Sequence, residues 1–182
     1  MCRLPLAPVP EPAGDALPYK PLHIAARDGD VRTLLALIKS GSSTNERATN
    51  VKWTALHIAA AFNKTVAVAA LLCHGADPNT YDIDGDTPLI TAASLGHTEV
   101  VQQLITKADL MQTSTRGETA LHAAADAGFD DIASHLIACG GFKLLNARTS
   151  DGRTARDLAC ANGHRAVIDL IDDVKQSKET LL

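Results

Sequence analysis

A ten-residue segment occurs five times in this chain of 182 residues, and this repetition constrains the fold more than any other feature. Its copies begin at Lys20, Thr54, Thr87, Thr119 and Thr154, and they read KPLHIAARDG, TALHIAAAFN, TPLITAASLG, TALHAAADAG and TARDLACANG. The intervals between successive copies are 34, 33, 32 and 35 residues. A unit of this length cannot bury its apolar face alone, so the sequence predicts one domain of stacked units.

Each unit carries signals for two short helices. Glycine, or asparagine in the second copy, ends the Ala-rich segment and marks a helix C-terminus in the left-handed conformation. An apolar-periodic stretch such as VRTLLALIKSG follows and predicts a second helix, which Gly41, Gly75 and Gly140 end in the first, second and fourth copies. Asp-Gly pairs at 84–85 and 151–152 predict tight hairpin turns, and the threonine that follows can cap the next helix.

On these motifs the chain resembles the ankyrin-repeat family, which has a repeat of about 33 residues and a T-P-L-H-x-A signature. The resemblance implies an all-α solenoid of stacked helix-turn-helix repeats with short β-hairpin loops. It covers residues 19–174, with repeats at about 19–49, 50–82, 83–115, 116–149 and 150–174. We expect residues 1–18 to form a Pro-rich disordered leader and residues 175–182 a flexible tail.

The repeated letters have structural interpretations. Alanine pairs such as 59–60 let the first helices of neighbouring repeats approach closely, because a larger side chain there would overpack the stack. His23, His57 and His122 share one position of the repeat, so we expect each imidazole to hydrogen-bond the main chain of the neighbouring turn rather than a metal. Arg156 replaces the motif leucine in the last copy, which is typical of a polar cap facing water.

Several classes of protein are disfavoured. The formal net charge of −4 offers no footprint for phosphate backbones, so direct nucleic-acid binding is not expected, and no apolar run is long enough to insert into a membrane. Nucleotide-binding and hydrolase motifs are absent, so we predict no catalytic residues and no cofactor. Cys2, Cys73, Cys139 and Cys160 lack metal-ligand spacing and are interpreted as reduced, buried or inert thiols. A cytoplasmic location is expected, with the nucleus or delivery into a host cell as alternatives.

A candidate binding surface follows from the resemblance, which implies that variable positions at the hairpin tips and on the inner face of the first helices contact partners. Four of the six aromatic residues fall in or beside these positions, and we expect exposed rings there, removable without loss of stability. Acidic residues adjoin them, which favours a partner with an apolar or aromatic segment flanked by basic residues. The predicted partner-binding residues are Tyr19, Trp53, Phe62, Tyr81, Ile83, Asp84, Asp86, Leu95, Glu118 and Asp126.

The sequence therefore predicts a non-catalytic, monomeric protein-protein interaction module. One alternative is that rings such as Tyr19 and Phe62 only cover the main chain of their neighbours. A second is an adaptor that links the partner to another protein through the Pro-rich N-terminus or the C-terminal tail. An enzyme or small-molecule binder is a third alternative, which would need a pocket of convergent titratable groups that a thin stack rarely offers.

Overall fold

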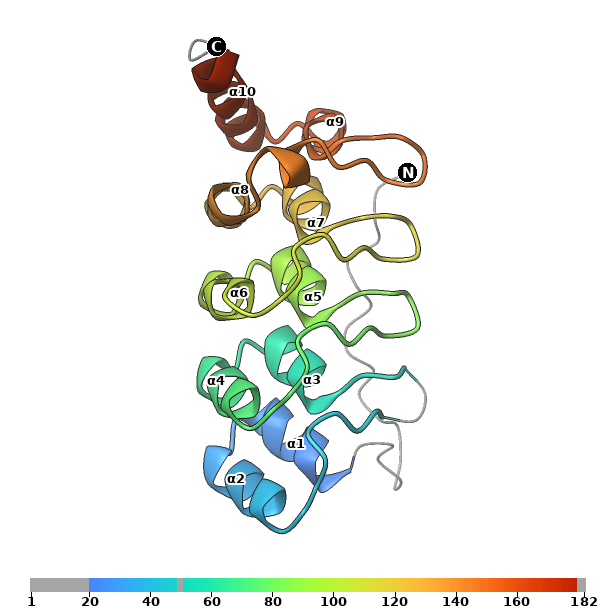
Figure 1. Cartoon of the computed structure of the whole chain (residues 1–182), viewed down its shortest axis with the longest axis vertical. Coiled ribbons are helices and arrows are strands. Elements are labelled where there is room, and N and C mark those ends of the chain that lie inside the picture. The colour runs from blue at the N-terminus through green and yellow to red at the C-terminus, as the bar shows by residue number, and fades with distance from the viewer. Residues whose placement is uncertain (1–19, 49–50, 180–182) are drawn as a thin grey trace.

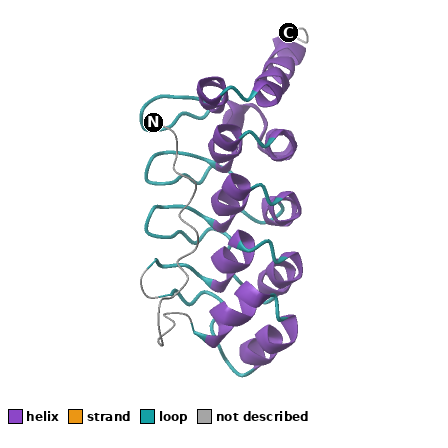
Figure 2. Cartoon of the chain, turned by 180° about the vertical axis from the view of Figure 1, so that it is seen from behind, coloured by secondary structure: helices purple, strands orange, loops and turns teal. Residues whose placement is uncertain are grey.

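Ten helices make up the regular structure of the part of the chain that the computed structural model describes, residues 20–48 and 51–179. They pair within each repeat, and the pairs stack along one long axis in two layers, with the loops projecting to one side (Figures 1 and 2). Their bounds are α1 Pro21–Asp28, α2 Val31–Lys39, α3 Ala55–Ala61, α4 Thr65–Cys73, α5 Pro88–Leu95, α6 Thr98–Ile105, α7 Ala120–Ala127, α8 Asp130–Leu145, α9 Ala155–Asn162 and α10 Arg165–Glu179. The all-α solenoid is confirmed. The predicted leader 1–18, Tyr19 and residues 180–182 lie outside the described residues.

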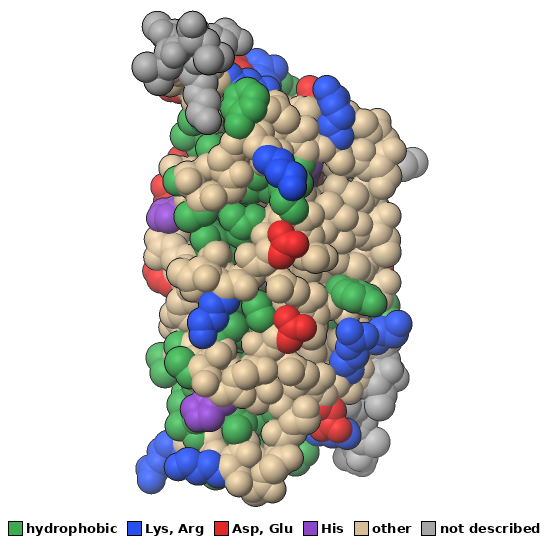
Figure 3. Space-filling view, viewed as in Figure 1, with side chains coloured by type: hydrophobic (Ala, Val, Ile, Leu, Met, Phe, Trp, Pro, Cys, Tyr) green, Lys and Arg blue, Asp and Glu red, His purple; other side chains and the backbone are tan. Residues whose placement is uncertain are grey.

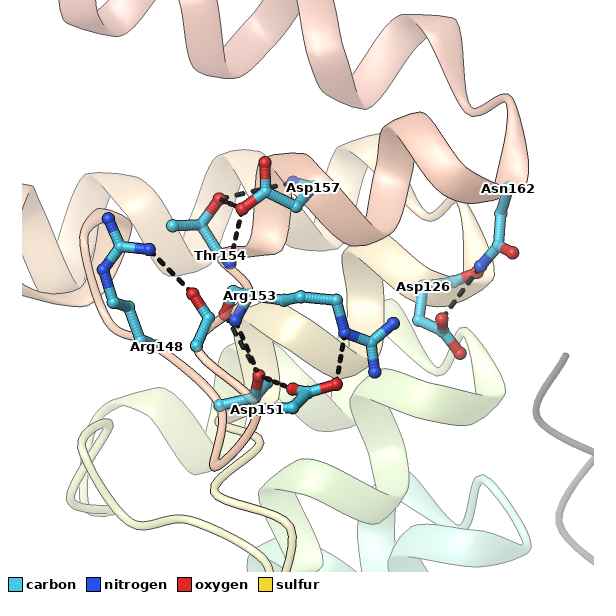
Figure 4. Close-up of polar contacts among 9 residues, drawn as sticks. Asp126, Arg148, Asp151, Arg153, Thr154, Asp157 and Asn162 are labelled. Atoms are coloured by element: carbon cyan, nitrogen blue, oxygen red, sulfur yellow. Dashed lines mark hydrogen bonds and ion pairs between the residues drawn. The ribbon is translucent and has the colours of Figure 1, made fainter. Parts of the chain in front are cut away.

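The first helix of most repeats begins at the motif threonine. The hydroxyl oxygen of Thr54 accepts a hydrogen bond from the His57 N–H, and the His57 imidazole accepts one from the Thr54 N–H, at 3.4 and 3.2 Å. Thr119 and His122 form the same reciprocal pair. In the last repeat an aspartate, Asp157, stands at the histidine position and accepts from the Thr154 N–H at 2.9 Å (Figure 4). The capping function is therefore kept although the imidazole is lost.

The helix ends follow the glycine pattern with one exception. The residues that close the first helices, such as Gly96 with φ 79° and Asn63 with φ 54°, have the left-handed conformation. In the fourth repeat the regular helix ends at the predicted Gly140, its last residue before the non-helical Gly141, but α8 does not stop there. The helical run is interrupted at Gly141, with φ 60° and ψ −155°, and a final turn then continues to Leu145. The two extra residues of this repeat are accommodated by that kink.

The core lies between the two helix layers and between successive repeats. The alanine pairs of the first helices are buried, as predicted, and large aliphatic side chains from the second helices cover them. These include Leu34, Leu71, Leu104 and Leu136, each fully buried. A small residue on one helix facing a branched residue on the other allows close-packed layers without aromatic side chains.

The hairpins are single turns rather than paired strands, since the described residues contain no β-strand. Within a hairpin, the Asp82 N–H donates to the Asp86 carbonyl at 3.1 Å, and Ser114 and Thr149 make the equivalent bond in later repeats. Adjacent hairpins are joined by one main-chain bond each, such as that from the Thr115 N–H to the Asp84 carbonyl at 2.8 Å. Each hairpin is therefore held by its neighbours along the stack.

The C-terminal repeat carries an ion pair at the predicted polar cap. Arg156 on α9 donates from Nε and Nη2 to the two carboxylate oxygens of Asp172 on α10, at 2.6 Å each. This bidentate contact replaces the leucine packing of the other repeats. The last helix continues to Glu179, past residue 174 where the sequence places the end of the repeats.

Candidate protein-binding surface

Two apolar side chains stand out from the hairpin that precedes α5. Tyr81 and Ile83 are 53% and 51% exposed, although most large hydrophobic residues of the chain are buried or half-buried. The half-buried Val51 of the preceding hairpin is beside them, because its carbonyl accepts the Ile83 N–H at 3.3 Å. We call Tyr81 and Ile83 the hairpin patch. Figure 3 shows hydrophobic side chains beside basic ones on the edge where the hairpins project.

Trp53 does not belong to the exposed surface, and the prediction of an exposed ring there is wrong. Its side chain is 7% exposed, and its Nε1–H donates to a carboxylate oxygen of Asp82 at 2.9 Å. The ring also stacks on His57, with centroids 6.4 Å apart and planes 15° apart. Asp82 holds the next hairpin in shape by accepting from the main-chain N–H groups of Asp84 and Asp86. Trp53 is thus a structural link between two hairpins.

The acidic residues predicted on this face are less accessible than expected. Asp86 and Glu118 are buried, and the Glu118 carboxylate pairs with Arg116 at 3.0 Å. Asp126 is half-buried and accepts from the Asn162 amide at 2.8 Å (Figure 4). Asp84 is therefore the one exposed member of the predicted acidic set. The predicted acidic face is corrected to a single exposed carboxylate beside the hairpin patch.

The inner-face residues of the candidate set contribute less surface than the hairpin patch. Phe62 caps the C-terminus of α3 and Leu95 is the last residue of α5; both are half-buried and pack against the core. For Phe62 this matches the alternative that the ring covers neighbouring structure. The structure thus brings Tyr81, Ile83 and Asp84 together on one hairpin and leaves the other candidates partly or wholly covered.

Two of the three repeated histidines, His23 and His57, hydrogen-bond the main chain of the neighbouring turn, as predicted, whereas the Nε2 of His122 has no hydrogen-bond partner among the described residues. The His57 Nε2–H donates to the Asp86 carbonyl at 3.2 Å, because Nδ1 is already an acceptor for the Thr54 N–H. His23 makes the equivalent contact to the Glu46 carbonyl at 3.1 Å. Burial lowers the pKa of His57 to about 4, although its bond to the Asp86 carbonyl opposes that shift, and burial also lowers the pKa of His23 and His122. These imidazoles are neutral structural groups at pH 7.

Burial of neutral His57 makes stability pH-dependent. Its pKa is about 4 in the folded chain and 6.5 in the unfolded chain, so the unfolded chain takes up a proton first as the pH falls. The resulting stability is present above pH 6.5 and is lost on acidification towards pH 4. We expect the free energy of unfolding of the wild type to fall by about 2 kcal/mol more between pH 7.5 and 5.0 than that of His57→Gln. Urea unfolding at both pH values measures this difference. An equal fall in the free energy of unfolding for the wild type and for His57→Gln would contradict the prediction.

Asparagines in the loops shape the turns between repeats. Asn45 Oδ1 accepts from the Asp77 N–H, and Asn79 Oδ1 accepts from the Asp109 N–H, both at 2.8 Å. Asn146 instead donates to the Phe142 carbonyl within its own helix end, because the α8 kink changes the loop. The three asparagines recur in the loops before the hairpins of their repeats, and the extra turn of α8 separates the third from the others.

Metal-ligand clusters and membrane-spanning helices are both absent from the described residues. Residues 20–48 and 51–179 contain no group of three or more His, Cys, Asp or Glu placed to hold a metal ion. None of the helices in these ranges is long and apolar enough to cross a bilayer. Cys73, Cys139 and Cys160 are exposed, so of the expected buried or inert thiols these three are not buried.

Comparisons with known proteins agree with the repeat architecture. A family model described as ankyrin repeats (3 copies) matches residues 22–114 and 106–179. The transient receptor potential cation channel subfamily A member 1 homolog of Caenorhabditis elegans is 31% identical over 153 residues, which are 84% of this chain and 12% of that protein. Tyrosine-protein kinase HTK16 of Hydra vulgaris is 30% identical over 167 residues, 88% of this chain and 22% of that protein.

A third relative matches a shorter region. The human ARF GTPase-activating protein GIT1 is 35% identical over 86 residues, which are 47% of this chain and 11% of that protein. The chain thus spans less than a quarter of each of these three relatives. Ankyrin repeats are in general non-catalytic modules that bind other proteins. With a family match across nearly all of its described residues and five stacked helix pairs, the chain belongs to the ankyrin-repeat family.

Proposed function

We propose that this chain binds a partner polypeptide through the hairpin patch and the adjoining ends of the first helices, without catalysing a reaction. The observation that carries the proposal is the half-exposure of Tyr81 and Ile83 on a hairpin that the neighbouring hairpins fix in place. The partner segment is apolar or aromatic where it covers the patch, and a basic residue of that segment lies against Asp84. The chain acts as a monomer in the cytoplasm.

Two physical arguments support this surface. A tyrosine buries a large area and loses little side-chain entropy on binding, so it is a frequent anchor of protein interfaces. The hairpin main chain is already hydrogen-bonded at Val51 and Thr115, so binding does not have to order it. The adaptor alternative needs a second binding segment in residues 1–18 or in the C-terminal tail, and it remains a prediction.

Removal of the hairpin patch should abolish binding without unfolding the chain. Peptides are selected from a displayed random 12-residue library on the wild-type protein and then synthesised as probes. For Tyr81→Ala/Ile83→Ser we expect at least a roughly 30-fold loss of affinity for these peptides, since truncation of an interface anchor costs about 2 kcal/mol or more. Fluorescence anisotropy of labelled peptides measures the affinity, and far-UV CD monitors the fold.

The matched control is Val66→Ser on α4, because Val66 is also an exposed large hydrophobic residue but lies on a helix of the other layer. Its affinity should equal that of the wild type. If Tyr81→Ala/Ile83→Ser keeps full affinity, or if no peptide is selected, the proposed surface is wrong.

A further inference from the structure

We propose that the hairpin patch binds a segment in which an apolar side chain stands next to a carboxylate, and that Arg47 and Lys52 hold that carboxylate. This inference rests on the proposed function and specifies its partner. It adds an acidic group to the partner, on the side of the patch that faces the hairpin of Arg47 and Lys52. The bound segment then has one direction along the stack, with its acidic residue towards the N-terminal repeats and its basic residue towards the C-terminal repeats.

Arg47 places a cation directly on the hairpin patch. Its guanidinium carbon lies 5.1 Å from the centroid of the Tyr81 ring, which is within the range of a cation–π contact. Both side chains are exposed, and Arg47 makes no ion pair with any residue in 20–48 and 51–179. The ring holds the guanidinium in position while its N–H donors remain available. A carboxylate that arrives beside the ring can accept two of them in parallel.

Lys52 provides a second cation beside the hairpin patch. It follows Val51, the residue whose carbonyl accepts the Ile83 N–H, so its main chain runs beside Ile83. Lys52 is exposed and likewise forms no ion pair within the described ranges. Arg47 and Lys52 therefore flank the two apolar side chains at the edge nearest the first repeat.

The main-chain conformation of Lys52 supports a role for its side chain. Its φ is 57°, a left-handed value, whereas the corresponding positions of the later hairpins hold Gly85, Gly117 and Gly152 with φ between 73° and 83°. A residue with a Cβ is strained in this conformation, and glycine is not. The first hairpin thus carries a lysine where the fold favours glycine, which is the pattern expected when a side chain is retained for binding at some cost in stability.

The later hairpins differ from the hairpin of Arg47 and Lys52 in the ion pairs that they form. Arg116 pairs with Glu118 at 3.0 Å, and Arg153 pairs with Asp151 at 2.6 Å (Figure 4). Arg116 and Arg153 are therefore neutralised by carboxylates of their own hairpins, whereas Arg148 donates to the Gly152 carbonyl at 2.7 Å. Arg47 and Lys52 pair with no carboxylate of the described residues, although Asp84 is exposed on the same patch, so a partner carboxylate complements these two cations.

Peptide selection tests the inference directly. A displayed random 12-residue library is selected in parallel on the wild type, on Arg47→Glu/Lys52→Glu and on Arg32→Glu/Lys39→Glu at low salt. The third protein is the matched control, because it carries the same charge change on exposed residues of α2. We expect wild-type and control peptides to be enriched in Asp or Glu next to an apolar residue, and Arg47→Glu/Lys52→Glu to lose this enrichment or to select Lys and Arg instead.

Affinity and salt dependence provide a second readout. A selected acidic peptide should bind Arg47→Glu/Lys52→Glu about tenfold more weakly than the wild type, and the difference should shrink at high salt because exposed charges are screened. Lys52→Gly should unfold at a higher temperature than the wild type, yet bind the same peptide more weakly. An unchanged or improved affinity of Lys52→Gly contradicts a binding role for this lysine.

The outcomes separate the two proposals. If Tyr81→Ala/Ile83→Ser abolishes binding but charge reversal at Arg47 and Lys52 changes neither the selected sequences nor the affinity, the binding surface stands and the carboxylate site is wrong. If binding is insensitive to Tyr81 and Ile83, or if the wild type selects no peptide, both proposals fail.

Discussion

Replacement of Trp53 by alanine should lower the free energy of unfolding by about 3–5 kcal/mol, the range for the loss of a large buried aromatic side chain. The indole fills the space between two hairpins and stacks on His57. Its removal leaves a cavity there, and it also removes the N–H that donates to Asp82 at 2.9 Å. A buried carboxylate oxygen without that donor adds to the loss.

Equilibrium urea unfolding followed by far-UV CD measures this effect, since the chain has a single tryptophan and loses its fluorescence signal in the variant. Tyr81→Ala is the matched control, because it removes an exposed aromatic ring of the next hairpin and should cost less than about 1 kcal/mol. Trp53→Phe keeps a ring but loses the donor, so we expect an intermediate loss. A Trp53→Ala midpoint within error of the wild type would contradict the structural role given to this side chain.

Replacement of Leu121 by alanine should cost about 2–5 kcal/mol. Leu121 lies near the start of α7, is fully buried, and belongs to the layer of first helices in which α7 packs between α5 and α9. In a stack of repeats each unit is stabilised through its interfaces with its neighbours, so a cavity in an inner repeat weakens two interfaces together. A leucine-to-alanine change in a terminal repeat weakens a single interface, because that repeat has one neighbour.

The same urea experiment tests this prediction. Val66→Ala serves as its control, because this exposed side chain also loses methyl groups and should change the free energy of unfolding by less than about 0.5 kcal/mol. We expect the unfolding transition of Leu121→Ala to shift to lower urea concentration. The transition should also broaden if the repeats before and after Leu121 unfold at different urea concentrations. Equal midpoints for Leu121→Ala and Val66→Ala would contradict the assignment of Leu121 to the core.

Several features of the fold were predictable from short stretches of the sequence. The threonine caps, the left-handed residues that end the first helices and the burial of the alanine pairs depend on a residue and its near neighbours in sequence. The interrepeat bond of His57 was predictable because three histidines share one repeat position. The end of the regular helix at the glycine pair 140–141 was predictable in the same way, whereas the further turn to Leu145 was not.

The repeat in the sequence, by itself, determined that this chain forms a stack of helix pairs, since units of this size are stable only against one another. Which hairpin side chains remain exposed was decided by the tertiary structure. Trp53 is buried because Asp82, 29 residues later, reaches it from the next hairpin, and Glu118 is buried although its partner Arg116 is exposed. Exposure at a hairpin depends on the hairpin stacked beside it, and no local pattern encodes that contact. The same stacking left Arg47, Lys52, Tyr81 and Ile83 together at the surface.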